Sequence, residues 1–212
     1  MSTLVFVTGN KGKFKEAKEF FSAEGIKIIN KKLPIEERRG TLEEIAEDAA
    51  KQAYKKLRAP LFVEDSGLFI HALNGFPGEF SAWAFKKIGN EGILKLLGGE
   101  KSRRACFRSV IAYADGNRIK FFKGVCAGRI ADRIRGRGGF GYDPIFIPEG
   151  KNFTFAERED LKTVLSHRYN SLKKLLKFLK KRKVENDGKN AFQKKGKERN
   201  KKAKEEGECP MG

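Results

Sequence analysis

The sequence predicts an α/β protein in which helices cover a mixed β-sheet. Three observations support this fold class. Short apolar segments alternate with helical ones in the first part of the 212-residue chain, as in sheets whose parallel strands are joined by helices. Two β-rich segments then flank Asp115-Gly116, a dipeptide typical of hairpin turns, so an antiparallel pair is expected over residues 105–130. An amphipathic helix closes the folded part of the chain.

Hydrophobic periodicity sets the expected order of elements. Strands are expected at the short runs of apolar, β-branched and aromatic residues: 3–8, 26–30, 61–65 and 144–148. Helices are expected where apolar residues recur at helical spacing: 11–24, 41–57, 90–97 and 166–182. The second helix has the clearest signal, because Thr41 and Glu44 form a capping box ahead of its apolar stripe. The third strand is expected to stop on Glu64 and Asp65.

The balance of charges favours polyanionic partners. The chain has 46 basic and 27 acidic residues, a formal net charge of +19, which suits nucleic acid, nucleotides or anionic surfaces without choosing among them. Residues after 182 are highly charged and poor in apolar side chains, so they cannot offset the entropy of ordering. We therefore expect one folded domain over 1–182 and a disordered basic tail over 183–212, which would add weak nonspecific contact with nucleic acid.

The cysteines and the N-terminus indicate a cytoplasmic protein. Cys106, Cys126 and Cys209 are odd in number and lack metal-ligand spacing, which suggests reduced thiols in an intracellular protein. The first ten residues have no basic segment ahead of an apolar one, so they do not form a signal peptide. No apolar run approaches the roughly 20 residues that span a bilayer.

The segment "VFVTGNKGKFKEA", residues 5–17, has the parts of a phosphate-binding loop: a strand, glycines, a helix start and lysines. It is not a Walker loop, because Gly12 follows Gly9 too closely and Phe14 stands where that motif has a hydroxyl residue. A helix N-terminus with Lys13 one turn inside it would still attract an anion. An ordinary β–α turn with surface lysines explains the same residues.

Two acids in "VEDSG", residues 63–67, are a second candidate site. Glu64 and Asp65 fall at a strand end, where open α/β sheets bind ligands, and carboxylate oxygens suit a hard cation such as magnesium. Strand alternation sends the two side chains to opposite faces, so at most one is expected to point into the core. A solvated strand end accounts for both acids equally well.

Three other segments carry candidate functional groups. In "GGFGYDP", residues 138–144, an aromatic ring between glycines suits stacking on a base, although a loop anchored by two buried rings has the same pattern. In "KTVLSHR", residues 162–168, the cationic side chains converge only if the chain turns at Ser166, a good helix N-cap. The acids of "PIEERRG", residues 34–40, are typical of an ordinary loop, and His71 is interpreted as structural or incidental.

In series, these motifs resemble those of the Ham1/RdgB family of inosine triphosphate pyrophosphatases. The matching stretches are "FVTGNKGK", "VEDSGL" with "ALNGFPG", "FGYDPIF", "TFAE" and "SHR". They run from residue 6 to residue 168 and so cover nearly all of the expected folded domain. Arg158 departs from the family pattern, in which methionine is frequent after "TFAE".

The resemblance implies an enzyme that hydrolyses ITP, dITP and XTP to the monophosphate and pyrophosphate, and so removes deaminated purines from the nucleotide pool. It also implies dependence on Mg²⁺ and a homodimer. Asp65 matches the metal-binding general base of the family, and Glu37 best matches the second metal ligand, with Glu36 as the other possibility. The positions matching the substrate contacts of the family are Thr8, Gly9, Asn10, Lys11, Gly12, Lys13, Ser66, Phe140, Gly141, Tyr142, Asp143, Lys162, His167 and Arg168.

Two alternative functions remain at this stage. Maf-type pyrophosphatases share the expected architecture but attack other modified nucleotides, and the "SHR" and "FGYDP" segments favour the Ham1 resemblance over them. A basic nucleic-acid-binding module would explain the net charge. Its basic residues are spread along the chain, however, and no familiar DNA- or RNA-binding motif is present.

Overall fold

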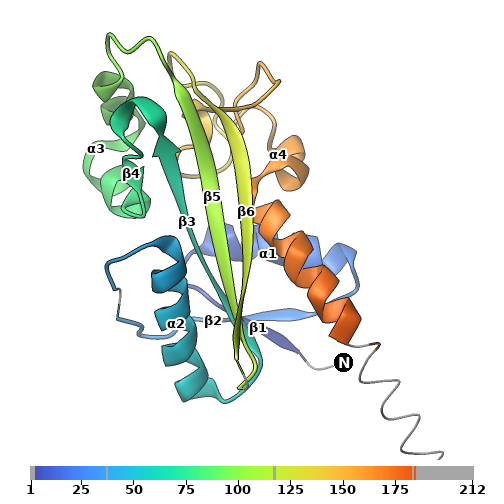
Figure 1. Cartoon of the computed structure of the whole chain (residues 1–212). Helices are drawn as coiled ribbons and strands as arrows, with labels where there is room; N and C mark the ends of the chain where they lie inside the picture. The colour runs from blue at the N-terminus through green and yellow to red at the C-terminus, as the bar shows by residue number, and fades with distance from the viewer. Residues whose placement is uncertain (1–2, 37, 117, 183, 185–212) are drawn as a thin grey trace, which may run out of the picture. The chain divides into compact units, whose positions relative to one another are not determined.

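The computed structural model describes residues 3–36, 38–116, 118–182 and 184. In this part of the chain seven strands form one sheet, in the order β2-β1-β3-β5-β6-β7, with β4 paired to β3 outside that path (Figure 1). The strands are β1 Leu4–Val7, β2 Ile28–Lys31, β3 Leu61–Ile70, β4 Pro77–Gly78, β5 Arg104–Ala114, β6 Ile119–Ile130 and β7 Phe146–Pro148. The α-helices are α1 Lys11–Ala23, α2 Leu42–Leu57, α3 Ser81–Leu96 and α4 Glu159–Leu165, and residues 167–182 are also helical. Two short 3-10 helices are present, η1 His71–Leu73 and η2 Asp143–Ile145.

The chain divides into two compact units, Met1–Leu175 and Leu176–Gly212. The sheet, α1 to α4 and the first turns of the helix that begins at residue 167 belong to the first unit. In the second unit the described residues are helical, and the Arg182 guanidinium lies 5.6 Å from the centre of the Phe178 ring. The tail predicted over 183–212 lies outside the described residues apart from residue 184, so it stays a prediction.

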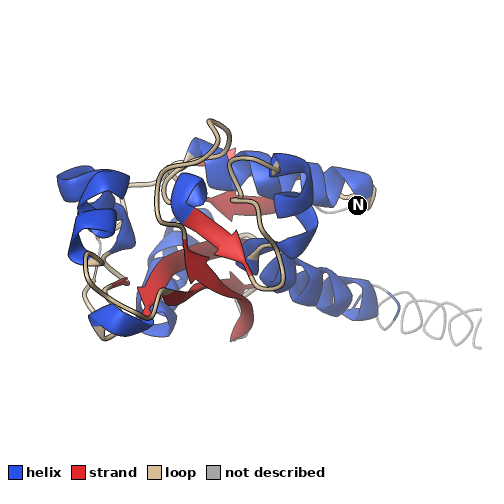
Figure 2. Ribbon diagram, turned by 90° about the horizontal axis from the view of Figure 1, so that it is seen from above, coloured by secondary structure: helices blue, strands red, loops and turns tan. Residues whose placement is uncertain are grey.

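The sheet confirms the predicted fold class, because it combines both kinds of strand pairing. Strand β1 lies parallel to β2 and β3, and β3, β5, β6 and β7 are antiparallel neighbours. Side-chain alternation on β3 separates two helical layers: Phe62 packs near Phe21 of α1, and Val63 packs against α2. Figure 2 shows helices on both sides of the strands. Among the described helices, none has the length and apolar character needed to cross a membrane.

One predicted strand end is wrong. The strand expected to stop at Asp65 continues to Ile70, since β5 pairs with it over its whole length. Gly67, two residues after Asp65, does not end the strand, and a Cβ there would lie 2.1 Å from the carbonyl oxygen of Gly78. This glycine allows a close approach of β4 rather than a turn. The acids at 64 and 65 therefore lie inside a strand, just beyond the part that pairs with β1.

Local signals placed some of the other elements to within a few residues and others less well. The capping box of Thr41 and Glu44 is present at the start of α2, as predicted. The helix expected over 90–97 begins earlier, at Ser81, and Gly89 interrupts it with φ 61° and ψ −163°. Strand β7 is shorter than predicted, because η2 occupies the first part of the expected range, and α4 was not predicted.

Candidate active site

The segment that follows β1 forms a capped helix start. The side chain of Asn10 accepts a hydrogen bond from the Lys13 backbone N–H at 3.0 Å and so caps α1. The Asn10 N–H donates to Thr8 Oγ1 at 3.1 Å, which tightens the turn out of the strand. The predicted strand, turn and helix are therefore all present, and the first turn of α1 faces a pocket.

This pocket has a volume of about 460 Å³ and contains most of the residues predicted to bind substrate. The predicted residues that line it are Asn10, Lys11, Gly12, Lys13, Asp65, Ser66, Phe140, Gly141, Tyr142, Asp143, Lys162, His167 and Arg168. Thr8 and Gly9 do not line it and instead shape the turn before α1. Glu37 lies outside the described residues. The structure brings these side chains together, and their roles stay predictions.

Buried and partly buried side chains of alternating sign run along the pocket, and we call this series the charge chain. Its members, in order, are Lys13, Glu64, Arg168, Glu16, Lys162 and Asp143. Glu64 Oε2 lies 3.0 Å from Lys13 Nζ and 3.4 Å from Arg168 Nε. Burial alone would raise the pKa of Glu64, but Arg168 and Lys13 outweigh it and hold that pKa well below its usual value. Glu64 is therefore charged at neutral pH.

The other half of the charge chain connects α1 to the loop before η2. Glu16 forms ion pairs with Arg168 and, at 2.6 Å, with Lys162. Burial tends to raise the pKa of Glu16, and the two cations lower it overall. Lys162 Nζ also donates to Asp143 Oδ2 at 2.6 Å, and burial nevertheless raises the pKa of that carboxyl. Arg168 and Lys162 thus each lie between two carboxyl groups of the series.

The glycine-flanked aromatic ring lies in the pocket. Gly139 and Gly141 both have positive φ, 70° and 62°, so the loop bends sharply on each side of Phe140. The Phe140 N–H donates to Asp143 Oδ2 at 2.7 Å, which holds the loop to the charge chain. Lys162 Nζ lies 4.2 Å from the centre of the Phe140 ring, within range of a cation–π contact. The pattern of residues 138–144 therefore places a ring beside two buried cations.

Helix α3 forms one side of the pocket. The Tyr142 hydroxyl donates to the Ser81 carbonyl at 3.0 Å, and its ring meets Phe85 edge to face at 5.2 Å. Burial raises the pKa of Tyr142 to about 12, so its hydroxyl remains a donor at neutral pH. Asn90, just after the break at Gly89, donates to the Gly141 carbonyl at 3.2 Å. The aromatic loop is therefore held to both halves of this helix.

Asp65 lies on the opposite face of β3 from Glu64, as strand alternation predicted. Its side chain is 28% exposed, and its Oδ1 lies 4.0 Å from Lys13 Nζ. Of the two acids, the buried one is Glu64 and the accessible one is Asp65. Within the described ranges, no group of three His, Cys, Asp or Glu side chains is arranged to hold a metal ion. Asp65 can therefore offer one carboxylate to a cation that keeps most of its water.

His167 is buried in the pocket wall. Its ring stacks on Phe107 with the centroids 4.6 Å apart, and its Nδ1 has no hydrogen-bond partner in the described structure. Burial, with Arg168 next to it, holds the pKa of His167 well below the ordinary 6.5. The imidazole is neutral in the folded protein at neutral pH.

The neutral state of His167 predicts a pH dependence of stability. Below about pH 6.5 the unfolded chain binds a proton at this position and the folded chain does not, so the free energy of unfolding falls as the pH drops, by up to about 1.4 kcal/mol per pH unit. Urea unfolding at about pH 7 and pH 5 should show a smaller loss for His167→Gln than for the wild type. The control is the variant His71→Gln, because the other histidine, His71, is exposed. Equal losses of unfolding free energy in His167→Gln and in the wild type would contradict the neutral state of His167.

Sequence reasoning missed Glu16, the charged role of Glu64 and the wall contributed by α3. Glu16 lies one turn after Lys13 on α1, so the helical period could have placed it at the same face. Glu64 was interpreted only as a cation ligand or a solvated acid. The residues of the pocket wall that were not predicted are Gly67, Glu79, Ser81, Ala82, Phe85, Lys86 and Phe107.

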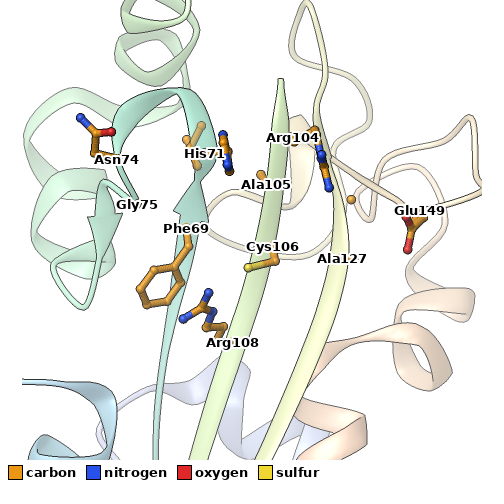
Figure 3. Close-up of a pocket in the computed structure, with 12 residues that line it drawn as sticks. Phe69, His71, Asn74, Gly75, Arg104, Ala105, Cys106, Arg108, Ala127 and Glu149 are labelled. Atoms are coloured by element: carbon orange, nitrogen blue, oxygen red, sulfur yellow. The ribbon is translucent and has the colours of Figure 1, made fainter. Parts of the chain in front are cut away.

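A second pocket, also of about 460 Å³, lies on the other face of β5 (Figure 3). Phe69, Cys106 and Arg108 are among the residues that line it. The Arg108 guanidinium lies 4.5 Å from the centre of the Phe69 ring. Phe107, between these two residues of β5, lines the first pocket instead. The two pockets therefore lie back to back across one strand. None of the predicted site residues that the structure describes lines the second pocket.

Comparison with known proteins supports the resemblance seen in the motifs. The Ham1 family profile matches residues 4–178. A dITP/XTP pyrophosphatase of Thermococcus kodakarensis is 49% identical over 179 residues, which are 84% of this chain and 97% of the relative. The protein of that name from Methanopyrus kandleri is 49% identical over 180 residues, 84% of this chain and 96% of the relative.

Solved structures show the same fold. The Staphylococcus aureus Ham1 protein aligns with a TM-score of 0.75 at 34% identity, covering 85% of this chain and 99% of that protein. A HAM1 protein from Coxiella burnetii aligns with a TM-score of 0.75 at 33% identity, covering 85% and 100%. Taken with the match along residues 4–178, these likenesses show that the chain belongs to the Ham1 family.

Proposed function

We propose that this chain hydrolyses the triphosphates of deaminated purines, ITP, dITP and XTP, to the monophosphate and pyrophosphate. One observation carries the proposal: a single pocket joins a lysine-bearing helix start, an accessible aspartate and an aromatic ring flanked by buried cations. The relatives named dITP/XTP pyrophosphatases support the choice of substrate. The Maf-type and nucleic-acid-binding alternatives have no comparable support.

The first turn of α1, with Lys11 and Lys13, forms what we call the phosphate half of the pocket. Backbone N–H groups at a helix start and the positive end of the helix dipole favour an anion. Lys13 Nζ lies near Asp65 as well as Glu64, so it can contact phosphate oxygens beside the accessible carboxylate. These groups would hold the β- and γ-phosphates.

Asp65 is the proposed general base. A water molecule attacks the α-phosphorus, its oxygen forms the new P–O bond, and the bond to the bridging oxygen breaks to release pyrophosphate. Asp65 accepts the proton that the attacking water loses. Its partly exposed carboxylate also fits magnesium, which binds one or two carboxylates and keeps several waters, with Glu37 as the predicted second ligand. Bound magnesium would supply positive charge at the phosphate oxygens.

Phe140, Lys162 and Arg168 form what we call the base half. The Phe140 ring would stack on the purine. Hypoxanthine and xanthine have an oxygen acceptor at position 6, which a buried cation can bind, and adenine has an amino donor there. Binding adenine would leave a buried donor unpaired, which supports discrimination of about 10⁴-fold. Guanine shares the 6-oxo group, so its exclusion depends on its 2-amino group.

Pyrophosphate release from ITP, XTP, GTP and ATP, with magnesium and with EDTA, tests the proposal. We expect fast release from ITP and XTP that EDTA abolishes, and slow release from the other two. Equal rates on all four would leave the phosphate chemistry standing and overturn the selectivity argument. No release from a folded protein would overturn the proposed function and favour the nucleic-acid alternative.

We also propose a homodimer, on the family resemblance, and a cytoplasmic location, on the composition of the chain. Cys106 and Cys126 are free thiols, which agrees with a reducing compartment, and Cys209 lies outside the described residues. Contact between the tail and nucleic acid stays a prediction.

A further inference from the structure

We propose that Glu64, oriented by Ser109, is a positioning residue that couples the phosphate half of the pocket to the base half. In this role it fixes Lys13 and Arg168 relative to each other, so that one ligand meets both cations at the correct separation. The inference rests on the proposed function, because it assigns a role within that same pocket.

Glu64 is the one member of the charge chain that joins a cation of each half. Its Oε2 lies 3.0 Å from Lys13 Nζ and 3.4 Å from Arg168 Nε, and Lys13 Nζ also donates to the Glu64 carbonyl oxygen at 3.2 Å. The carboxylate is 1% exposed, and Arg168 is 3% exposed. Water therefore screens these contacts little, and the two cations depend strongly on where the carboxylate lies.

A buried hydroxyl sets the orientation of that carboxylate. Ser109 Oγ, on β5, donates to Glu64 Oε1 at 2.7 Å, which leaves Oε2 for the two cations. Ser109 and Ser171 are both fully buried, and their hydroxyl oxygens are 3.0 Å apart. Ser171 Oγ can donate to the Arg168 carbonyl at 2.9 Å. Because Ser109 gives its one proton to Glu64, Ser171 has a single proton to donate, either to Ser109 or to the Arg168 carbonyl, and in both cases the two hydroxyls pack directly beside the carboxylate.

A purely stabilising role explains this arrangement poorly. Buried ion pairs add little net stability, because desolvation offsets their attraction. Arg168 has a second carboxylate, Glu16, so loss of Glu64 would leave it paired and in the pocket but free to reorient. Lys13 would lose its carboxylate partner at 3.0 Å. The expected result is a pocket with all its cations and the wrong spacing between them.

The main test is Glu64→Gln, which keeps the size of the side chain and removes its charge. We expect kcat/KM for ITP to fall at least about tenfold, as for other misplaced binding groups. Binding of pyrophosphate alone and of inosine monophosphate alone should each change less than about threefold, since each reaches only one half. Glu47→Gln, a partly exposed acid on α2 that pairs with Lys51 outside the pocket, controls for the change in net charge and should match the wild type.

Ser109→Ala is the second variant. It keeps the charge of Glu64, so it still tests the proposal if Glu64→Gln fails to fold. We expect a loss of about threefold in kcat/KM, which should vanish when Ser109→Ala is added to Glu64→Gln, because the hydroxyl acts through the carboxylate. Additive losses would overturn the role of Ser109. Unchanged or raised ITP hydrolysis in Glu64→Gln, or equal losses for ITP, pyrophosphate and the monophosphate, would overturn the coupling. Absence of ITP hydrolysis in the wild type would instead refute the proposed function.

Discussion

Asp65→Asn is expected to lower the turnover of ITP by at least about a hundredfold, the scale of losing a general base or a charge-stabilising group. The amide keeps the size of the side chain but cannot accept the proton of the attacking water, and it is a poorer ligand for magnesium. The carboxylate of Asp65 is partly exposed beside Lys13, so the substitution leaves no charge stranded in the core.

The measurement is single-turnover and steady-state release of pyrophosphate from ITP, with folding checked by circular dichroism. Asp132→Asn is the matched control, because that side chain is 88% exposed and lies outside the pocket lining. The control should keep wild-type rates. Near-normal turnover of a well-folded Asp65→Asn protein would remove Asp65 from the catalytic role.

Gly124→Ala is expected to produce the largest loss of stability, about 3 kcal/mol or more, at the upper end for overpacking. A Cβ at this position of β6 would lie 1.9 Å from the His167 carbonyl oxygen and 2.6 Å from the Ser171 N. Both are backbone atoms, so no side chain can rotate away to make room. Either the strand or the helix that begins at residue 167 must move, and that helix carries Arg168 into the pocket.

Urea unfolding measures the stability, and kcat/KM for ITP of the remaining folded protein reports on the pocket. We expect both to fall, because the same displacement loosens the core and moves Arg168. Val125→Ala, at the next position of the same strand, is the control: this side chain is 52% exposed and its truncation should cost little. Wild-type stability in Gly124→Ala would show that the close approach is absent in solution.

Local patterns predicted much of the fold. The capping box of α2, the apolar run of β1 and the hairpin turn at Asp115-Gly116 each depend on residues close together in the chain, so periodicity and turn chemistry reveal them. The predicted end of β3 was wrong because it depends on contacts with residues far away in the chain. Its continuation depends on pairing with β5, and the role of Gly67 depends on the carbonyl of Gly78.

The candidate site divides in the same way. The residues that line the pocket were found because their motifs resemble those of a family, and the structure brings most of them together. The charge chain was missed, because Glu16 and Arg168 are 152 positions apart and nothing local marks them as partners. A lone acid on a helix is usually a solvated one, and only the packing of α1 against the helix from residue 167 makes Glu16 an exception.

The back-to-back pockets impose a constraint on change in β5. Successive residues of a strand face opposite sides, so Phe107 belongs to one pocket and Cys106 and Arg108 to the other. Inserting or deleting a single residue before this point would exchange the two linings and bring Arg108 to the side where the Phe107 ring now stacks on His167. A substitution in this stretch changes the lining of one pocket, but a change of length by one residue would change both linings at once.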